Sequence, residues 1–366
     1  MNIMSKIKKL NKNVLGIIIL VVLVALTMWM ILKDNDIASI WQAMLTLQPG
    51  WLVLACFAAV FFVCGEGFMI WYLLRKMKSK QSLLNCFGYS FVGFFFSGIT
   101  PSATGGQPMQ LYYMTKDKIK ISDSTVALTI VATLYKFVLV LIGVFMAVFF
   151  NATLHQYLKG YIYLYYFGLA LNAVVVAALL FLMINPRAFR KILIKCEHAL
   201  VRIRILKPSM KRARKLTNIA AEYNNAVMAF VHNVKPIIAT TVMTVVQRMS
   251  IFFVTYCIYR GMDLNEKDIV LITVLQASVY VAVDMLPLPG AQGISELMYQ
   301  TVFGTVFAGA LLPASVLITR GVSFYLPLII GAVTTFIFQL TRNKFGRTKE
   351  DKEDKELEEL REIANG

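Results

Sequence analysis

The strongest constraint on this chain is a series of uncharged stretches that are each long enough to cross a lipid bilayer. A helix needs about 20 apolar residues to span the hydrocarbon core, and such runs recur along the whole sequence. Hydrophobic residues make up 58% of the chain and charged residues only 16%, whereas soluble domains average about 45–50% and about 25%. The sequence therefore excludes a soluble enzyme and a disordered or fibrous protein. It predicts an all-α polytopic membrane protein.

The net charge of +17 is concentrated in short segments between the apolar runs. Cytoplasmic loops of membrane proteins are enriched in Lys and Arg, so this distribution predicts that both termini lie in the cytoplasm. No nucleic-acid-binding motif accompanies the charge, and we expect no nucleic-acid partner.

Six full spans follow from the positions of the basic flanks. They are Val14–Leu32, Trp51–Leu74, Val126–Phe150, Tyr161–Ile184, Ile237–Tyr259 and Ala314–Leu340. Residues 186–235 form a predicted cytoplasmic region of basic amphipathic helices. We therefore expect an integral membrane domain over residues 1–340 and a charged cytoplasmic tail over residues 341–366.

Two further apolar segments are interrupted by Gly- and Pro-containing breaks. Leu83–Ile99 is followed by the break Thr100–Pro108 and has basic residues on both sides, so we expect a re-entrant hairpin that opens to the cytoplasm. Ile269–Leu286 and Ile294–Leu312 flank a second break at 287–293. The last span must begin outside to end in the cytoplasm, so this pair begins and ends outside and its break is entered from the opposite face. The second arm of this pair is long, so two full spans are an alternative.

The two hairpins indicate an inverted repeat with about eight membrane segments in total. Three residues around the first break recur in the same order and spacing around the second: Pro101, Leu111 and Tyr113 become Pro287, Leu297 and Tyr299. Broken helices of inverted repeats meet near the midplane, where transporters place their substrate site.

Charged residues inside predicted spans are candidates for function, because they are costly in a bilayer and face cavities or partners. The cations are Lys136, Arg248 and Arg320, and the carboxylates are Glu66, Asp284 and Glu296. The cations suit an anionic phospholipid headgroup. The carboxylates have three alternative roles: internal ion pairs, binding of a basic headgroup, or titration of protons.

The breaks themselves offer backbone N–H groups, because helix N-termini bind phosphate. The candidates for contact with a lipid phosphate are Gly105, Gly106, Gln107, Gly290, Gln292, Gly293 and Ser295. The alternative is that the glycines only form the turns. We find no catalytic motif and no cysteine or histidine spacing typical of a metal site, so we expect no catalytic residue, metal or cofactor.

The two break motifs together resemble the lysylphosphatidylglycerol synthase transmembrane family, also called the flippase-like domain family. They read Thr100-Pro-Ser-Ala-Thr-Gly-Gly-Gln-Pro108 and Pro287-Leu-Pro-Gly-Ala-Gln-Gly-Ile-Ser-Glu296. The resemblance extends from about Lys6 to Arg342. The second motif departs from the family pattern with Ala291 and Gln292 after Gly290.

In bifunctional members of that family, the membrane domain moves aminoacylated phosphatidylglycerol to the outer leaflet, and a separate cytoplasmic domain makes the lipid. The resemblance implies a lipid translocase of the bacterial plasma membrane, a homodimer, with membrane phospholipids as partners. Its substrate is lysyl-phosphatidylglycerol, another glycerophospholipid or a polyprenyl-linked precursor.

Two other functions follow from the same resemblance. One is a membrane component that docks a separate aminoacyl-lipid synthase through the basic residues 187–215, and the other is phosphatidylglycerol lysyltransferase activity itself. We expect no lysine transfer by this chain alone, because the segment after the last span is too short for a synthase domain.

Overall fold

The computed structural model describes residues 37–202 and 210–342, and this part of the chain is helical without a strand. Five helices in it are long and apolar enough to cross a membrane. They are Pro49–Lys76 (α3), Ile121–Phe149 (α6), Asn151–Ile184 (α7 and α8), Lys235–Gly261 (α11) and Leu311–Arg342 (α14 and its continuation). Five of the six predicted spans are thereby confirmed, and the predicted span Val14–Leu32 lies outside the described residues. The chain is a multi-pass membrane protein.

The first broken segment folds into two short helices, which we call hairpin 1. It consists of α4 (Leu83–Gly98), the 3₁₀ turn η1 (Pro101–Ala103) and α5 (Gly106–Lys116). At 1.5 Å per residue these helices are about 24 Å and about 17 Å long, which is less than the roughly 30 Å of the hydrocarbon core. The helices pack against each other, so the chain reverses at the predicted break.

The second broken segment, hairpin 2, has the same construction. It consists of α12 (Ile269–Val283), the 3₁₀ turn η3 (Pro289–Ala291) and α13 (Ile294–Phe303). The predicted arm Ile294–Leu312 is shorter than expected, because α13 ends at Phe303 and an irregular segment at 304–310 separates it from α14. A helix of about 15 Å does not cross a bilayer, so the alternative of two full spans is wrong for this arm.

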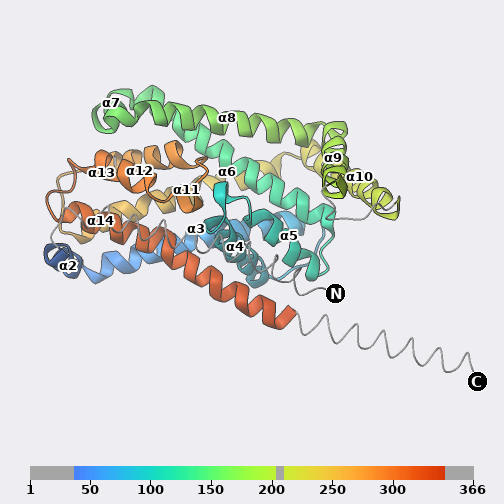
Figure 1. Cartoon of the computed structure of the whole chain (residues 1–366), viewed down its shortest axis with the longest axis horizontal. Coiled ribbons are helices and arrows are strands. Elements are labelled where there is room, and N and C mark those ends of the chain that lie inside the picture. The colour runs from blue at the N-terminus through green and yellow to red at the C-terminus, as the bar shows by residue number, and fades with distance from the viewer. Residues whose placement is uncertain (1–36, 203–209, 343–366) are drawn as a thin grey trace, which may run out of the picture.

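The helices form an elongated bundle with further helices at both ends (Figure 1). The basic region forms α9 (Pro186–Arg202) and α10 (Met210–His232) at one end, and α2 (Ile37–Leu45) and α7 (Asn151–Leu158) lie at the other. The turns η1 and η3 contact each other. The two breaks in the sequence therefore meet in space.

Two apolar clusters hold the bundle together. The larger one joins α3, α11, α12, α13 and α14 around buried residues such as Phe252, Leu275 and Phe303. The other joins α3, hairpin 1 and α6 with α10, whose Tyr223 and Val227 are buried against them. The basic region is thus attached to the bundle through α10 and is not a free loop.

Candidate functional site

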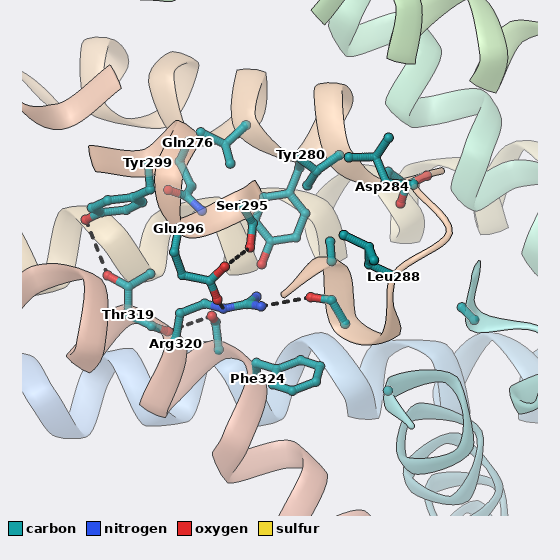
Figure 2. Close-up of a pocket in the computed structure, with 18 of the residues that line it drawn as sticks. Gln276, Tyr280, Asp284, Leu288, Ser295, Glu296, Tyr299, Thr319, Arg320 and Phe324 are labelled. Atoms are coloured by element: carbon teal, nitrogen blue, oxygen red, sulfur yellow. Dashed lines mark hydrogen bonds and ion pairs between the residues drawn. The ribbon is translucent and has the colours of Figure 1, made fainter. Parts of the chain in front are cut away.

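A cavity of about 200 Å³ lies where the two hairpins meet. Ser97 and Ala103 of hairpin 1 line one part, and Gly290 and Ser295 of hairpin 2 line another. The rest of the wall mixes aliphatic, polar and charged residues with six aromatic ones from α3, α4, α6, α12, α13 and the last span: Phe62, Phe94, Tyr135, Tyr280, Tyr299 and Phe324. Figure 2 shows the charged side chains gathered on the hairpin 2 side.

An ion pair between Arg320 and Glu296 is the centre of this site (Figure 2). Arg320 lies near the end of α14 and Glu296 in the first turn of α13, and Arg320 Nε is 2.6 Å from Glu296 Oε1. Arg320 Nη2 also donates to the carbonyl oxygen of Gly290 at 2.8 Å. One arginine therefore joins the last span to both the break and the second arm of hairpin 2.

Glu296 also caps the helix on which it stands. Its Oε2 accepts hydrogen bonds from the backbone N–H of Gly293 at 2.8 Å and from Ser295 Oγ at 2.7 Å. An acidic residue at this position satisfies free N–H groups of the first turn and complements the helix dipole. The N–H of Gly293 before α13, which the sequence offered to a phosphate, is therefore already bonded to a carboxylate of the chain.

The turn of hairpin 2 requires glycine at Gly290, which has a φ of 58° and lies against the ring of Phe324. A Cβ at that position would be 2.4 Å from Phe324 Cζ.

The buried Gln292 amide lies between the two charges of the Arg320–Glu296 pair. With its nitrogen toward Glu296 Oε1 (3.1 Å), its oxygen accepts from Arg320 Nη2 (2.8 Å).

A second ion pair joins Lys136 of α6 to Asp284, which follows α12 and lines the cavity. Lys136 Nζ also lies 3.0 Å from the Met285 sulfur. The side chain of Lys136 is 20% exposed and that of Asp284 11% exposed. Each of these two cations thus has a carboxylate partner, as the ion-pair alternative predicts, and the two pairs have no net charge.

Arg248 has no carboxylate partner among the described residues and is fully buried. Its Nη2 donates to the carbonyl oxygen of Tyr135 at 3.2 Å, and its guanidinium lies 3.4 Å from the centre of the Tyr135 ring. Within the described part of the chain, its Nε and Nη1 have no hydrogen-bond partner. Tyr135 lines the cavity and Arg248 does not, so the ring separates this cation from the cavity.

Glu66 lies in the middle of α3, outside the cavity lining. Its Oε1 accepts a hydrogen bond from the side-chain amide of Gln110 on α5, at 2.6 Å. Gln110 in turn lies against Gly93 of α4, where a Cβ would be 2.3 Å from its Nε2. Glu66 is therefore joined to both arms of hairpin 1.

The break of hairpin 1 carries no charge. Thr100 Oγ1 donates to the carbonyl oxygen of Phe96 at 2.6 Å and accepts from the N–H of Gly105 at 2.9 Å. Gly106 is buried against Ser97. Gly105, Gly106 and the exposed Gln107 do not line the cavity, so this loop contributes only Ala103 to its wall.

Charge alone does not identify the polar and aromatic residues of the site. Gln276, Tyr280 and Asp284 all line the cavity and recur every fourth residue along one face of α12. This spacing is visible in the sequence, because side chains at i and i+4 share a face of a helix. Thr319 on the last span also lies in the wall, 3.4 Å from the Tyr299 hydroxyl.

A third ion pair, which the sequence analysis missed, ties the base of hairpin 1 to the end of the last span. Arg342 Nε and Nη2 lie 2.6 and 2.5 Å from the two carboxylate oxygens of Asp117, the residue after α5. Tyr89 donates a hydrogen bond to the same carboxylate. The guanidinium stacks on Phe338 at 3.3 Å. No pattern in the sequence connects residues this far apart.

Fold and site together define a multi-pass membrane protein with a charged interior cavity between two broken helices. The family of the lysylphosphatidylglycerol synthase TM region matches residues 13–331, which is most of the chain. The protein belongs to this family, and the membership indicates a function related to membrane lipids. No individual curated protein matches the sequence.

Proposed function

We propose that this protein is a lipid translocase that moves an anionic or aminoacylated phospholipid, such as lysyl-phosphatidylglycerol, between the leaflets of the bacterial plasma membrane. The observation that carries the proposal is the ion-paired cavity at the meeting point of the two breaks. Its volume of about 200 Å³ is below the roughly 300–1,000 Å³ of pockets that enclose a whole drug-sized ligand. It suits a headgroup whose acyl chains stay in the bilayer.

The proposed topology places both termini and residues 186–235 in the cytoplasm, with about eight membrane segments in an inverted repeat. The Lys and Arg distribution supports this orientation. The short arms of both hairpins and the contact between η1 and η3 support a repeat whose halves meet at the substrate site.

Arg320 is the proposed phosphate-binding residue. An incoming phosphate replaces Glu296 on the guanidinium, because arginine binds phosphate and carboxylate with the same planar donor geometry. Glu296 then keeps the N–H of Gly293 and the hydroxyl of Ser295 on its other oxygen, so the start of α13 is preserved. In this proposal, the released oxygen of Glu296 and the carboxylate of Asp284 bind the ammonium group of an aminoacylated headgroup.

Lys136 and Arg248 supply further positive charge in the same proposal. Lys136 reaches the headgroup by leaving Asp284, and Arg248 reaches it when the Tyr135 ring turns aside. The unpartnered Nε and Nη1 of Arg248 support this role, since an isolated cation inside a bilayer is costly. The backbone of residues 105–107 adds N–H donors when hairpin 1 moves toward the cavity and the N–H of Gly105 leaves Thr100.

The test separates transport from structural pairing by removing Arg320 alone or together with its partner. Arg320→Gln strands a buried carboxylate, which costs about 3–5 kcal/mol of stability. Arg320→Gln with Glu296→Gln removes both charges and restores most of the detergent thermostability. We expect the double variant to remain at least about tenfold slower in transport, the effect of about 1.4 kcal/mol.

Transport is measured as dithionite-accessible fluorescent phosphatidylglycerol and lysyl-phosphatidylglycerol in proteoliposomes. Arg260→Gln is the matched control, because Arg260 lies at the end of α11 beside Trp51, 5.6 Å from its ring, and outside the cavity. Normal transport by the stable double variant would contradict a phosphate site at Arg320.

A second candidate function is a membrane component of phosphatidylglycerol lysyltransferase, and the family description favours it. Here the exposed basic residues of α9, including Arg187 and Lys191, dock a separate synthase. Lipid extraction from cells with and without the gene distinguishes the two functions. A synthase component changes the total amount of lysyl-lipid, whereas a translocase changes only the outer-leaflet share.

A further inference from the structure

We propose that Glu66 is a proton-binding site that couples proton uptake to movement of hairpin 1; this rests on the proposed transport function. Three carboxylates lie in the spans and hairpins near the breaks. Asp284 and Glu296 each pair with a cation. Glu66 differs, because its hydrogen-bond partner in the described part of the chain is the neutral Gln110 amide.

The groups around Glu66 leave its charge unbalanced. On α11, Arg248 is directed to the carbonyl oxygen and ring of Tyr135. On α6, Tyr135 lies within electrostatic range of both Glu66 and Arg248, and the next residue, Lys136, is bound to Asp284. Other titratable groups on the elements packed against α3 include Cys86 and Tyr89 on α4, Asp123 in the first turn of α6 and Tyr325 in η4. The remaining cations of α3 and α11, which are Arg75, Lys76, Lys235 and Arg260, lie at the ends of these helices.

The chemistry of the site favours a proton over a metal cation. Hard cations such as Ca²⁺ take about six to eight oxygen ligands, and no cluster of three acidic, His or Cys side chains occurs among the described residues. A proton needs only one oxygen. It binds at Oε2 of Glu66, which has no protein donor in the described part, while Gln110 keeps its hydrogen bond to Oε1.

Protonation of Glu66 weakens the attachment of hairpin 1 to α3. A hydrogen bond to an ionised carboxylate is roughly twice as strong as a neutral one, so the Gln110 contact is strongest when Glu66 is charged. Gln110 is wedged against Gly93 on the opposite arm, and the turn of the same hairpin contacts η3 at the cavity. Proton binding therefore acts on hairpin 1, the side of the cavity whose break carries no charge. By thermodynamic linkage, movement of hairpin 1 also changes the affinity of Glu66 for the proton.

The experiment measures transport of fluorescent phosphatidylglycerol in proteoliposomes between about pH 5.5 and about pH 8.5. We expect the rate of the unmodified protein to change by about threefold or more over this range, because the charge of Glu66 sets the strength of its hydrogen bond to Gln110. Glu66→Gln should make the rate independent of pH, and Glu66→Asp should restore the dependence. Glu222→Gln is the control, because Glu222 is exposed on α10, far along the sequence from Glu66, and accepts a hydrogen bond from Ser122 at 3.0 Å.

A second measurement is independent of lipid movement. The thermostability of the detergent-solubilised protein is recorded over the same pH range, and we expect the profiles of the unmodified protein and Glu66→Gln to diverge. Parallel profiles, or a Glu66→Gln transport rate with the unmodified pH dependence, would overturn the proton site. Absence of transport with divergent profiles would instead contradict only the translocase function.

Discussion

Hairpin 1 and hairpin 2 share a construction but are anchored at opposite ends. The turn of hairpin 2 is fixed by charge, since Arg320 binds the Gly290 carbonyl and Glu296 caps α13. The turn of hairpin 1 is held by hydroxyl and backbone groups, and its charged anchor is at the base, where Asp117 binds Arg342.

This difference suggests that the two hairpins contribute different things, charged groups from one and movement from the other. A hairpin that is fixed at its turn keeps its charged side chains at the cavity wall. A hairpin that is fixed at its base, with a weakly held turn, can move that turn against the cavity. Under the proposed function, substrate binding is therefore assigned to hairpin 2 and movement to hairpin 1.

The largest effect is expected from breaking the base of hairpin 1. Asp117→Ala leaves the mostly buried Arg342 guanidinium without its carboxylate and should lower stability by about 3–5 kcal/mol. Thermal unfolding in detergent measures this loss. Asp117→Ala with Arg342→Met should recover most of it, and transport per folded molecule should persist, since neither residue lines the cavity. If Asp117→Ala is as stable as the unmodified protein, the Asp117–Arg342 pair does not anchor the base of hairpin 1.

The next effect concerns the turn of hairpin 2. Gly290→Ala places a methyl group 2.4 Å from Phe324 in a left-handed backbone conformation, so we expect a loss of about 2–3 kcal/mol from crowding and strain. The displaced carbonyl also releases Arg320, which should lower transport. Gly321→Ala is the control, because a Cβ there meets nothing within 4 Å. Equal thermostability of the two variants would show that the turn is not rigid.

Much of this architecture could be predicted from the sequence, and some of it could not. The breaks and the charged residues of the spans follow from local composition, whereas the second arm of hairpin 2 is shorter than the sequence predicted. The pairing of Lys136 with Asp284, and of Asp117 with Arg342, depends on contacts between distant segments. The role of Glu296 as a cap is visible only once the start of α13 at Ile294 is known.

A smaller effect is expected from removing single hydroxyl groups at the two turns, Ser295 in hairpin 2 and Thr104 in hairpin 1. Ser295→Ala removes one donor from the buried Glu296 carboxylate and should cost about 1–2 kcal/mol. Thr104→Ala removes an exposed hydroxyl bond to Pro101 and should change stability by less than about 0.5 kcal/mol. Thermal unfolding of both variants measures the difference. Similar losses would mean that the two turns are held equally.

The smallest effect is expected where the two hairpins are alike. Each break contains an alanine in the left-handed region, Ala103 with a φ of 54° and Ala291 with a φ of 51°. An L-residue there costs about 1–2 kcal/mol, and glycine relieves that strain while adding roughly 0.5–1 kcal/mol of backbone entropy to the unfolded chain. Ala103→Gly and Ala291→Gly should therefore each stabilise the protein by about 0.5–1 kcal/mol in thermal unfolding. A gain at only one position would show that the two turns differ in backbone as well as in charge.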